Sequence, residues 1–137
     1  MVWSCLGSIL PGMAQTEKLT DYVNPFFGTD GYGNVYPGAQ IPFGGIQISP
    51  DTDSRFYDAA SGYKYNHLTL MGFSLTHLSG TGIPDLGDFL FIPGTGEMKL
   101  EPGTHEDPDQ GYRSRYSHDK EWASPNYYAV ELADYGV

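Results

Sequence analysis

The sequence predicts an all-β fold, an antiparallel β-sandwich, on three observations. Short runs of alternating apolar and polar residues recur along the chain, and residues that form turns separate them. Strand-favouring aromatics are abundant, with 11 Tyr and 7 Phe, and so are the turn residues, with 18 Gly and 10 Pro. No stretch combines a helical apolar stripe with capping residues. Because parallel strands need crossover helices, the strands are expected to pair antiparallel.

The expected strands are read from these runs in order. Tyr128, Val130 and Leu132 share one face of the last run, and Gly72 interrupts the longest one, where it suggests a bulge. The run ending at Pro93 is expected to be short and buried. The predicted strands cover residues 44–49, 63–65, 68–76, 89–93, 112–117 and 127–132.

Size and charge limit the classes of function. A chain of 137 residues and 15.1 kDa has room for one domain with a real core. Its net charge of −10 excludes nucleic acid as a natural partner, because phosphate binding needs a basic face. An anionic membrane would repel the chain as well. A neutral ligand such as a sugar suits this charge.

The two ends of the chain carry separate predictions. Residues 1–14 resemble the second half of a secretory signal peptide, with an apolar stretch and small residues up to Ala14, although a buried first strand is the alternative. A secreted or periplasmic protein is therefore expected, with a single Cys5 that cannot form an internal disulfide. Residues 15–137 are expected to form the β-sandwich domain. It is expected to be incomplete, because the turn at residues 134–136 has no return strand after it.

Glycine-rich segments at residues 28–38 and 79–82 carry the remaining signals. Neither has the Lys-Ser or Lys-Thr of a phosphate loop or a full dinucleotide fingerprint. The four His lack zinc spacing, no nucleophile elbow is present, and the two Asp-x-Asp pairs lack the rest of a calcium loop. A long ordered loop rich in aromatics and acids suits sugar binding, since rings pack on a pyranose and carboxylates accept its hydroxyls. Core aromatics and turn-forming acids are the alternative interpretation of the same residues.

A series of motifs in fixed order resembles the start of the family 92 glycoside hydrolases. The segments are YVNPFFGTDG from Tyr22, YPGA from Tyr36, QISPDT from Gln47, SGY from Ser61, GFS from Gly72, THLSGTG from Thr76, PDLGD from Pro84, YSH from Tyr116, and ASP from Ala123. Together they cover about residues 20 to 137.

The resemblance implies a secreted, calcium-dependent exo-α-mannosidase that acts with inversion. In that family an amino-terminal β-sandwich precedes an (α/α)6 barrel, which holds the catalytic acid and base and the calcium ligands. We therefore expect no catalytic residue and no metal ligand within this chain, and no hydrolysis by the chain alone. Its partners would be an α-mannoside glycan and its own carboxyl-terminal barrel, with no nucleic acid and no membrane insertion of the mature chain.

The resemblance also implies which residues line the sugar pocket. The candidates lie in the first glycine-rich loop, around an aromatic platform that is commonly Trp in the family, and in the second loop. They are Phe26, Gly28, Thr29, Asp30, Gly33, Tyr57, Asp58 and His77. For His77, a hydrogen bond that braces residues 79–82 is at least as good an interpretation as contact with sugar.

Departures from the family pattern leave the substrate open. Relatives often have His in place of three residues and Thr in place of a fourth, so the linkage preference among α-mannosides is not defined. The departures are Tyr32, Asn34, Leu75 and Val35. A stand-alone carbohydrate-binding or interaction module without hydrolysis, and a fold remnant without a ligand, are the alternatives to a hydrolase domain.

Overall fold

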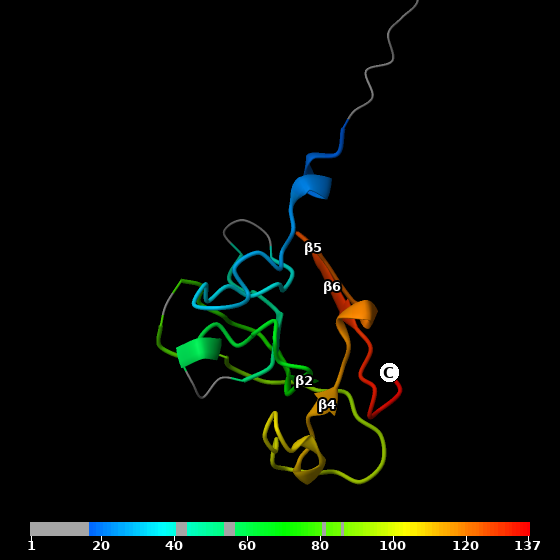
Figure 1. The fold of residues 1–137 in the computed structure, drawn as a ribbon. Coiled ribbons are helices and arrows are strands. Elements are labelled where there is room, and N and C mark those ends of the chain that lie inside the picture. Colours follow the sequence, from blue (N-terminus) through cyan, green and yellow to red (C-terminus); the bar gives the residue numbers. More distant parts are fainter. Residues whose placement is uncertain (1–16, 41–43, 54–56, 81, 86) are drawn as a thin grey trace, which may run out of the picture.

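The computed structural model describes residues 17–40, 44–53, 57–80, 82–85 and 87–137. Within these ranges the regular structure consists of short antiparallel strands in three two-stranded sheets and of short 3₁₀ helices (Figure 1). The predicted all-β, antiparallel class is confirmed. The signal-peptide prediction for residues 1–14 lies outside the described residues, and no helix of the described part is long and apolar enough to cross a membrane.

The first sheet joins β1 (Ser49–Asp51) to β3 (Gly72–Ser74). Asp51 lies opposite Gly72, and all three residues of β1 are buried. Two isolated bridges extend this region, Ala39 with Ile48 and Phe73 with Phe91. This sheet matters for the site because the SGY motif follows β1 and the second glycine-rich loop follows β3.

The second sheet joins β2 (Thr69–Leu70) to β4 (Ser114–Arg115). One residue, Met71, separates β2 from β3, so the chain passes from one sheet to the next at Gly72. The sequence suggested a bulge at this glycine within one long strand. The structure instead divides that run between two sheets. In one of them β2 pairs with β4, and in the other β3 pairs with β1.

The third sheet is a hairpin of β5 (Glu121–Ser124) and β6 (Tyr127–Val130). Ser124 pairs with Tyr127, so Pro125 and Asn126 form a two-residue turn. The expected strand at 127–132 is confirmed over 127–130, with Leu132 buried beyond it. No strand was expected at β5, because it mixes acidic, aromatic and small residues without alternation.

The hydrophobic core is small. Its buried members are Tyr63, Leu70, Tyr116 and Leu132, and the partly buried Phe26, Phe73, Ile92, Val130 and Tyr135 pack around them. A core built by residues from both halves of the chain explains how a loop-rich sequence holds one arrangement.

A carboxylate is buried at the edge of this core. Glu121, whose side chain is 1% exposed, accepts hydrogen bonds from the hydroxyls of Tyr63 at 2.8 Å and Tyr128 at 2.5 Å. Its other oxygen lies 2.6 Å from Nδ1 of His118. Three donors compensate the cost of burying this charge.

Several expected strands differ from the observed ones. Residues 44–49 form no strand before Ser49, and residues 63–65 form none, because the amides of Lys64 and Tyr65 donate to the Thr52 hydroxyl and the Thr29 carbonyl instead of a ladder. The predicted strand 112–117 is reduced to Ser114–Arg115.

The run at residues 89–93 was expected to be buried, and this prediction is wrong. Phe91 pairs with Phe73 through two backbone hydrogen bonds of 2.7 and 2.9 Å, yet its side chain and that of Phe89 are exposed. A single bridge fixes the backbone here without placing a second layer over the rings.

In the described part of the chain, one short 3₁₀ helix precedes the first strand and three lie between strands. They are η1 (Leu19–Tyr22), η2 (Tyr57–Ala59), η3 (Pro108–Gln110) and η4 (His118–Lys120). In η4 the Ser117 hydroxyl accepts from the amide of Asp119, and the helix leads directly into β5. Helix η2 carries Tyr57 and Asp58 from the predicted site.

Candidate functional site

The first glycine-rich loop, residues 24–38, is held by its own turns. The Asn24 side chain accepts from the amide of Phe26 at 3.0 Å, and the Asp30 side chain accepts from the amide of Gly31 at 2.8 Å. The Thr29 hydroxyl donates to the Phe26 carbonyl at 2.8 Å. Short polar side chains that bond to nearby backbone are a standard way to fix a loop without strands.

Two glycines of this loop approach each other too closely for any side chain. A Cβ on Gly33 would lie 2.1 Å from the carbonyl oxygen of Gly28, and Gly28 itself has a φ of +84°. The glycines therefore make the loop tight rather than loose.

A buried lysine and its neighbour attach the loop to the body of the domain. Lys64, which is 7% exposed, donates through Nζ to the Gly31 carbonyl at 2.9 Å. The amide of Tyr65 donates to the Thr29 carbonyl at 2.9 Å. Both contacts come from the segment that follows the SGY motif, so this segment is physically joined to the first glycine-rich loop.

Four of the predicted site residues line one pocket on this loop. The pocket has a volume of about 290 Å³ and is lined by Asn24, Phe26, Phe27, Gly28, Thr29, Asp30 and Tyr65. The ring of Phe26 packs edge-on against Tyr65 at 5.7 Å between centroids, while Thr29 is buried and Asp30 is exposed. The pocket thus combines an aromatic wall with an exposed carboxylate. An aromatic ring and a carboxylate are groups that can contact a ligand with hydroxyl groups.

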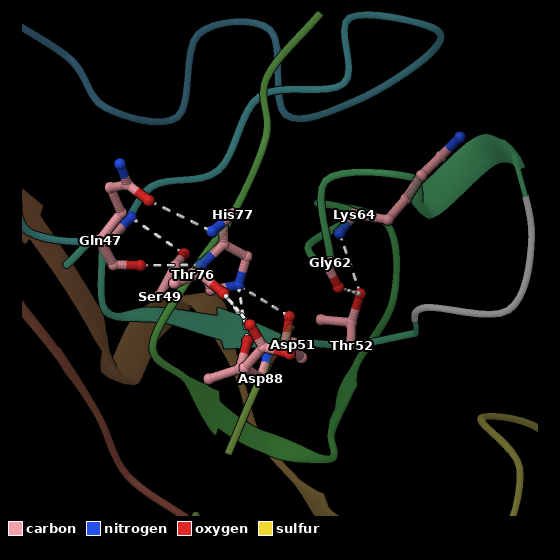
Figure 2. A network of polar contacts seen from close by, with 11 residues as sticks. Gln47, Ser49, Asp51, Thr52, Gly62, Lys64, Thr76, His77 and Asp88 are labelled. Carbon is pink, nitrogen blue, oxygen red and sulfur yellow. Dashed lines mark hydrogen bonds and ion pairs between the residues drawn. The ribbon is translucent and has the colours of Figure 1, made fainter. Parts of the chain in front are cut away.

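The second glycine-rich loop follows His77, whose polar contacts Figure 2 shows. The imidazole Nδ1 lies 2.8 Å from the Gln47 carbonyl oxygen, and Nε2 lies 2.9 Å from Oδ1 of Asp51 and 3.0 Å from the Ser74 hydroxyl. The side chains of His77 and Asp51 are only 2% and 4% exposed. In this chain His77 is an internal bracing residue rather than part of an exposed surface.

The two glycine-rich loops meet directly. The amide of Gly80 donates to the Asn34 carbonyl at 2.7 Å, and the ring of Tyr36 lies 5.0 Å from that of His77. A second pocket of about 520 Å³ lies where the loops meet, with lining residues Val23, Pro25, Val35, Tyr36, Gly38, Gln40, Ser79 and Pro125. The loops are therefore parts of one surface.

The remaining predicted site residues lie apart from the 290 Å³ pocket. Tyr57 is 69% exposed in η2, and a Cβ on Gly82 would lie 3.9 Å from its ring, so it borders the second loop. Asp58 follows it in the same helix. Gly33 does not line that pocket but fixes the loop that forms it, and His77 lines a separate cavity of about 100 Å³.

The described residues do not fit a calcium site. No group of three His, Cys, Asp or Glu side chains gathers in the part of the chain that the structure describes. Asp107–Asp109 is a turn in which the Asp107 side chain is bonded to Gln110, and Asp51 is paired with His77.

Sequence reasoning missed the residues that hold the loops in place. Lys64 and Asp51 are buried charges on separate segments, and Gln47 contributes mainly its carbonyl. A lone lysine between two tyrosines signals a charge that needs a partner when buried. The partner of Lys64 is the backbone carbonyl of Gly31, and a backbone acceptor cannot be predicted from the residue types in the sequence.

The geometry defines an all-β domain whose surface is formed by two linked glycine-rich loops, and comparison with known proteins assigns this domain to a class of glycoside hydrolase. Residues 22–137 match the family model described as the glycosyl hydrolase family 92 N-terminal domain. The chain belongs to that family.

Solved structures share the fold. One is a family GH92 α-mannosidase from Bacteroides thetaiotaomicron in complex with mannoimidazole, with 99% identity and a TM-score of 0.85 over 88% of this chain and 16% of that one. Another is the family GH92 inverting mannosidase from Bacteroides thetaiotaomicron VPI-5482, with 25% identity and a TM-score of 0.59 over 88% of this chain and 16% of that one.

A curated relative from Arthroderma benhamiae is named an uncharacterized secreted glycosidase. It is 34% identical over 73 residues, which are 53% of this chain and 9% of the relative. The chain therefore spans a small part of the proteins that it resembles.

Proposed function

We propose that this chain is the amino-terminal, sugar-pocket-forming domain of a secreted, calcium-dependent exo-α-mannosidase that acts with inversion on mannose-containing glycans. The observation that carries the proposal is the family match over residues 22–137 together with 99% identity to an α-mannosidase that was solved with mannoimidazole. The pocket on the first loop supports the sugar-binding role, because a neutral ligand with hydroxyl groups suits its aromatic wall and exposed carboxylate.

The chemistry would be divided between two parts of the parent enzyme. An inverting glycosidase needs a general acid and a general base about 6.5–9.5 Å apart with a water between them. We assign both carboxylates, and the calcium, to the carboxyl-terminal barrel. This domain would orient the terminal mannose against that barrel through Phe26, Asp30 and the exposed ring of Tyr57.

Secretion is part of the same proposal. Its supports are the apolar segment at residues 1–14 and the description of the fungal relative as secreted. Expression of the native gene in a bacterial host, followed by fractionation of cytoplasm, periplasm and medium, tests it. Retention of the processed enzyme in the cytoplasm would contradict it.

The central test compares this chain with the full-length enzyme on an aryl α-mannoside. The full-length enzyme should release the aryl group, lose activity in a calcium chelator and regain it with Ca²⁺. Proton NMR of the first product should show the β-anomer of mannose. The 137-residue chain should show no turnover above a denatured control. Turnover by the 137-residue chain alone would contradict the assignment of both catalytic carboxylates to the barrel. Absence of mannosidase activity in the full-length enzyme would contradict the proposed mannosidase function.

A further inference from the structure

An apolar groove runs along residues 90–100, and none of the residues that line it belongs to either glycine-rich loop. Its volume is about 540 Å³, and its apolar lining residues include Leu90, Ile92, Met98, Leu100, Tyr112 and Tyr135. The side chains of Met98 and Leu100 are 84% and 81% exposed. Single exposed apolar side chains are common on proteins, whereas a groove lined by several of them marks a surface that contacts another segment or a ligand.

The backbone beside this groove is largely open. Phe91 is joined to Phe73 of β3 by two backbone hydrogen bonds, of 2.7 and 2.9 Å. Beyond this bridge, no backbone amide or carbonyl of residues 92–100 is hydrogen-bonded to a residue that the structure describes. A run of open amides and carbonyls is an edge to which an extended segment can add as a further strand. The groove therefore offers backbone pairing next to apolar contact.

Side chains hold the same segment in place. The Thr95 hydroxyl donates to the Tyr135 carbonyl at 3.4 Å, and Nζ of Lys99 donates to the Asp109 carbonyl at 2.7 Å. Gly94 packs on the ring of Tyr135, since a Cβ at Gly94 would lie 3.4 Å from that ring. Contacts within the domain thus shape the groove, and they leave its backbone edge open toward the described residues.

The matched proteins indicate what covers this surface. The chain spans 16% of the α-mannosidase to which it is 99% identical, and the matched family model describes an amino-terminal domain. In the proposed parent enzyme most of the polypeptide therefore follows residue 137. Tyr135 forms part of the groove wall, so this polypeptide would leave the domain next to the groove (Figure 1).

We propose that the groove along residues 90–100 is the docking surface for an extended, apolar segment of the parent enzyme that follows residue 137. The segment packs apolar side chains against Met98 and Leu100 and pairs its backbone with residues 92–100. A segment tethered by a short linker has an effective concentration on the order of 1 mM, which favours it over a second copy of the enzyme. The inference rests on the proposed function for the existence of the longer enzyme, and it does not depend on which sugar that enzyme cleaves.

Photo-crosslinking of the full-length enzyme identifies the occupant of the groove. Leu100 is replaced by p-benzoylphenylalanine, and the matched control carries the same replacement at Leu19, which is 75% exposed and does not line the groove. Irradiation should join position 100 to a peptide from beyond residue 137 of the same molecule, and position 19 should not capture that peptide. If the Leu100 variant does not fold, Met98 is replaced instead. A crosslink between two molecules, no crosslink, or the same peptide captured from both positions would overturn the proposal.

Hydrogen exchange of the unmodified full-length enzyme tests the backbone pairing. The amides of residues 94–100 should exchange at least about a hundredfold more slowly than those of an unstructured peptide of the same sequence. Exchange at the rate of the unstructured peptide would refute the pairing. Neither measurement uses mannosidase turnover. A full-length enzyme without that activity would therefore contradict the proposed function, and the crosslink and the exchange rates would still decide the docking surface.

Discussion

The backbone amide of Gly80 donates to the carbonyl of Asn34 at 2.7 Å, and this bond joins the two glycine-rich loops of the domain. Asn34 has a φ of 47° and Gly80 a φ of +76°, so both partners adopt the left-handed region to make it. Such conformations persist where surrounding contacts impose them. Residues next to both partners, Val35 and Ser79, line the 520 Å³ pocket, so we expect this pocket to depend on the contact.

A pair of glycine variants tests that dependence. A Cβ on Gly80 or on Gly96 would meet no atom within 4 Å, and both residues have a positive φ. Gly80→Ala and Gly96→Ala should each lower the free energy of unfolding by about 1 kcal/mol through backbone strain. In the full-length enzyme only Gly80→Ala should also lower kcat/KM, measured on an aryl α-mannoside. Equal values of kcat/KM in the two variants would show that the contact between the loops is not needed for activity.

The exposed ring of Tyr57 makes a second prediction. Because the side chain is 69% exposed, Tyr57→Ala should leave the melting temperature of the full-length enzyme nearly unchanged. Loss of a stacking surface for the sugar should reduce kcat/KM about three- to tenfold. Tyr127→Ala, at a ring that is 58% exposed in the hairpin, is the control and should keep normal kinetics. A fall in melting temperature that accounts for the lost activity would make Tyr57 a structural residue.

Glu121 should be one of the most sensitive positions in the domain. Glu121→Ala removes the shared acceptor of Tyr63, Tyr128 and His118, and should lower the free energy of unfolding by about 3–5 kcal/mol. Glu131→Ala, which removes a partly exposed partner of Lys120, should cost no more than about 1 kcal/mol. Chemical denaturation measures both. Similar midpoints for the two variants would show that the buried carboxylate contributes no special stability.

The buried tyrosines predict loss of stability at alkaline pH. Burial, together with nearby groups such as Glu121, raises the pKa of Tyr63 and of Tyr128 above the ordinary value of 10.0. The folded state therefore holds protons that the unfolded chain releases above about pH 10, so stability is full below pH 10 and falls as pH rises. Each tyrosine contributes a slope of about 1.4 kcal/mol per pH unit. Denaturation midpoints from pH 8 to 11 should show this fall, and Tyr63→Phe should make it shallower. A flat profile contradicts the assignment.

The sequence predicted the fold class better than the strand positions. Alternation at Tyr128 and Val130 identified β6, because one face of that strand packs on the core. The same kind of alternation at Ile46 and Ile48 misled, since both side chains are exposed and only Ile48 takes part in a bridge. In strands this short, a single backbone hydrogen bond decides which segments pair, and the residue types of the segment do not predict that bond.

The candidate site was partly predictable for a similar reason. Motif order placed Phe26, Gly28, Thr29 and Asp30 together, and they do line one pocket. The roles of Lys64 and Asp51 follow from three-dimensional contacts with Gly31 and His77 that have no fixed spacing along the chain. Whether any of these residues touches sugar stays a prediction.

The bond between Tyr63 and Glu121 spans 58 residues, and this separation has a consequence for biosynthesis. A ribosome that adds about 5–20 residues per second needs roughly 3–12 seconds to deliver the acceptor after the donor. Until Tyr116 and Leu132 have been added as well, Tyr63 and Leu70 lack the side chains that cover them in the core. We therefore expect these side chains to stay exposed during synthesis, and a pause in translation between these residues would prolong their exposure.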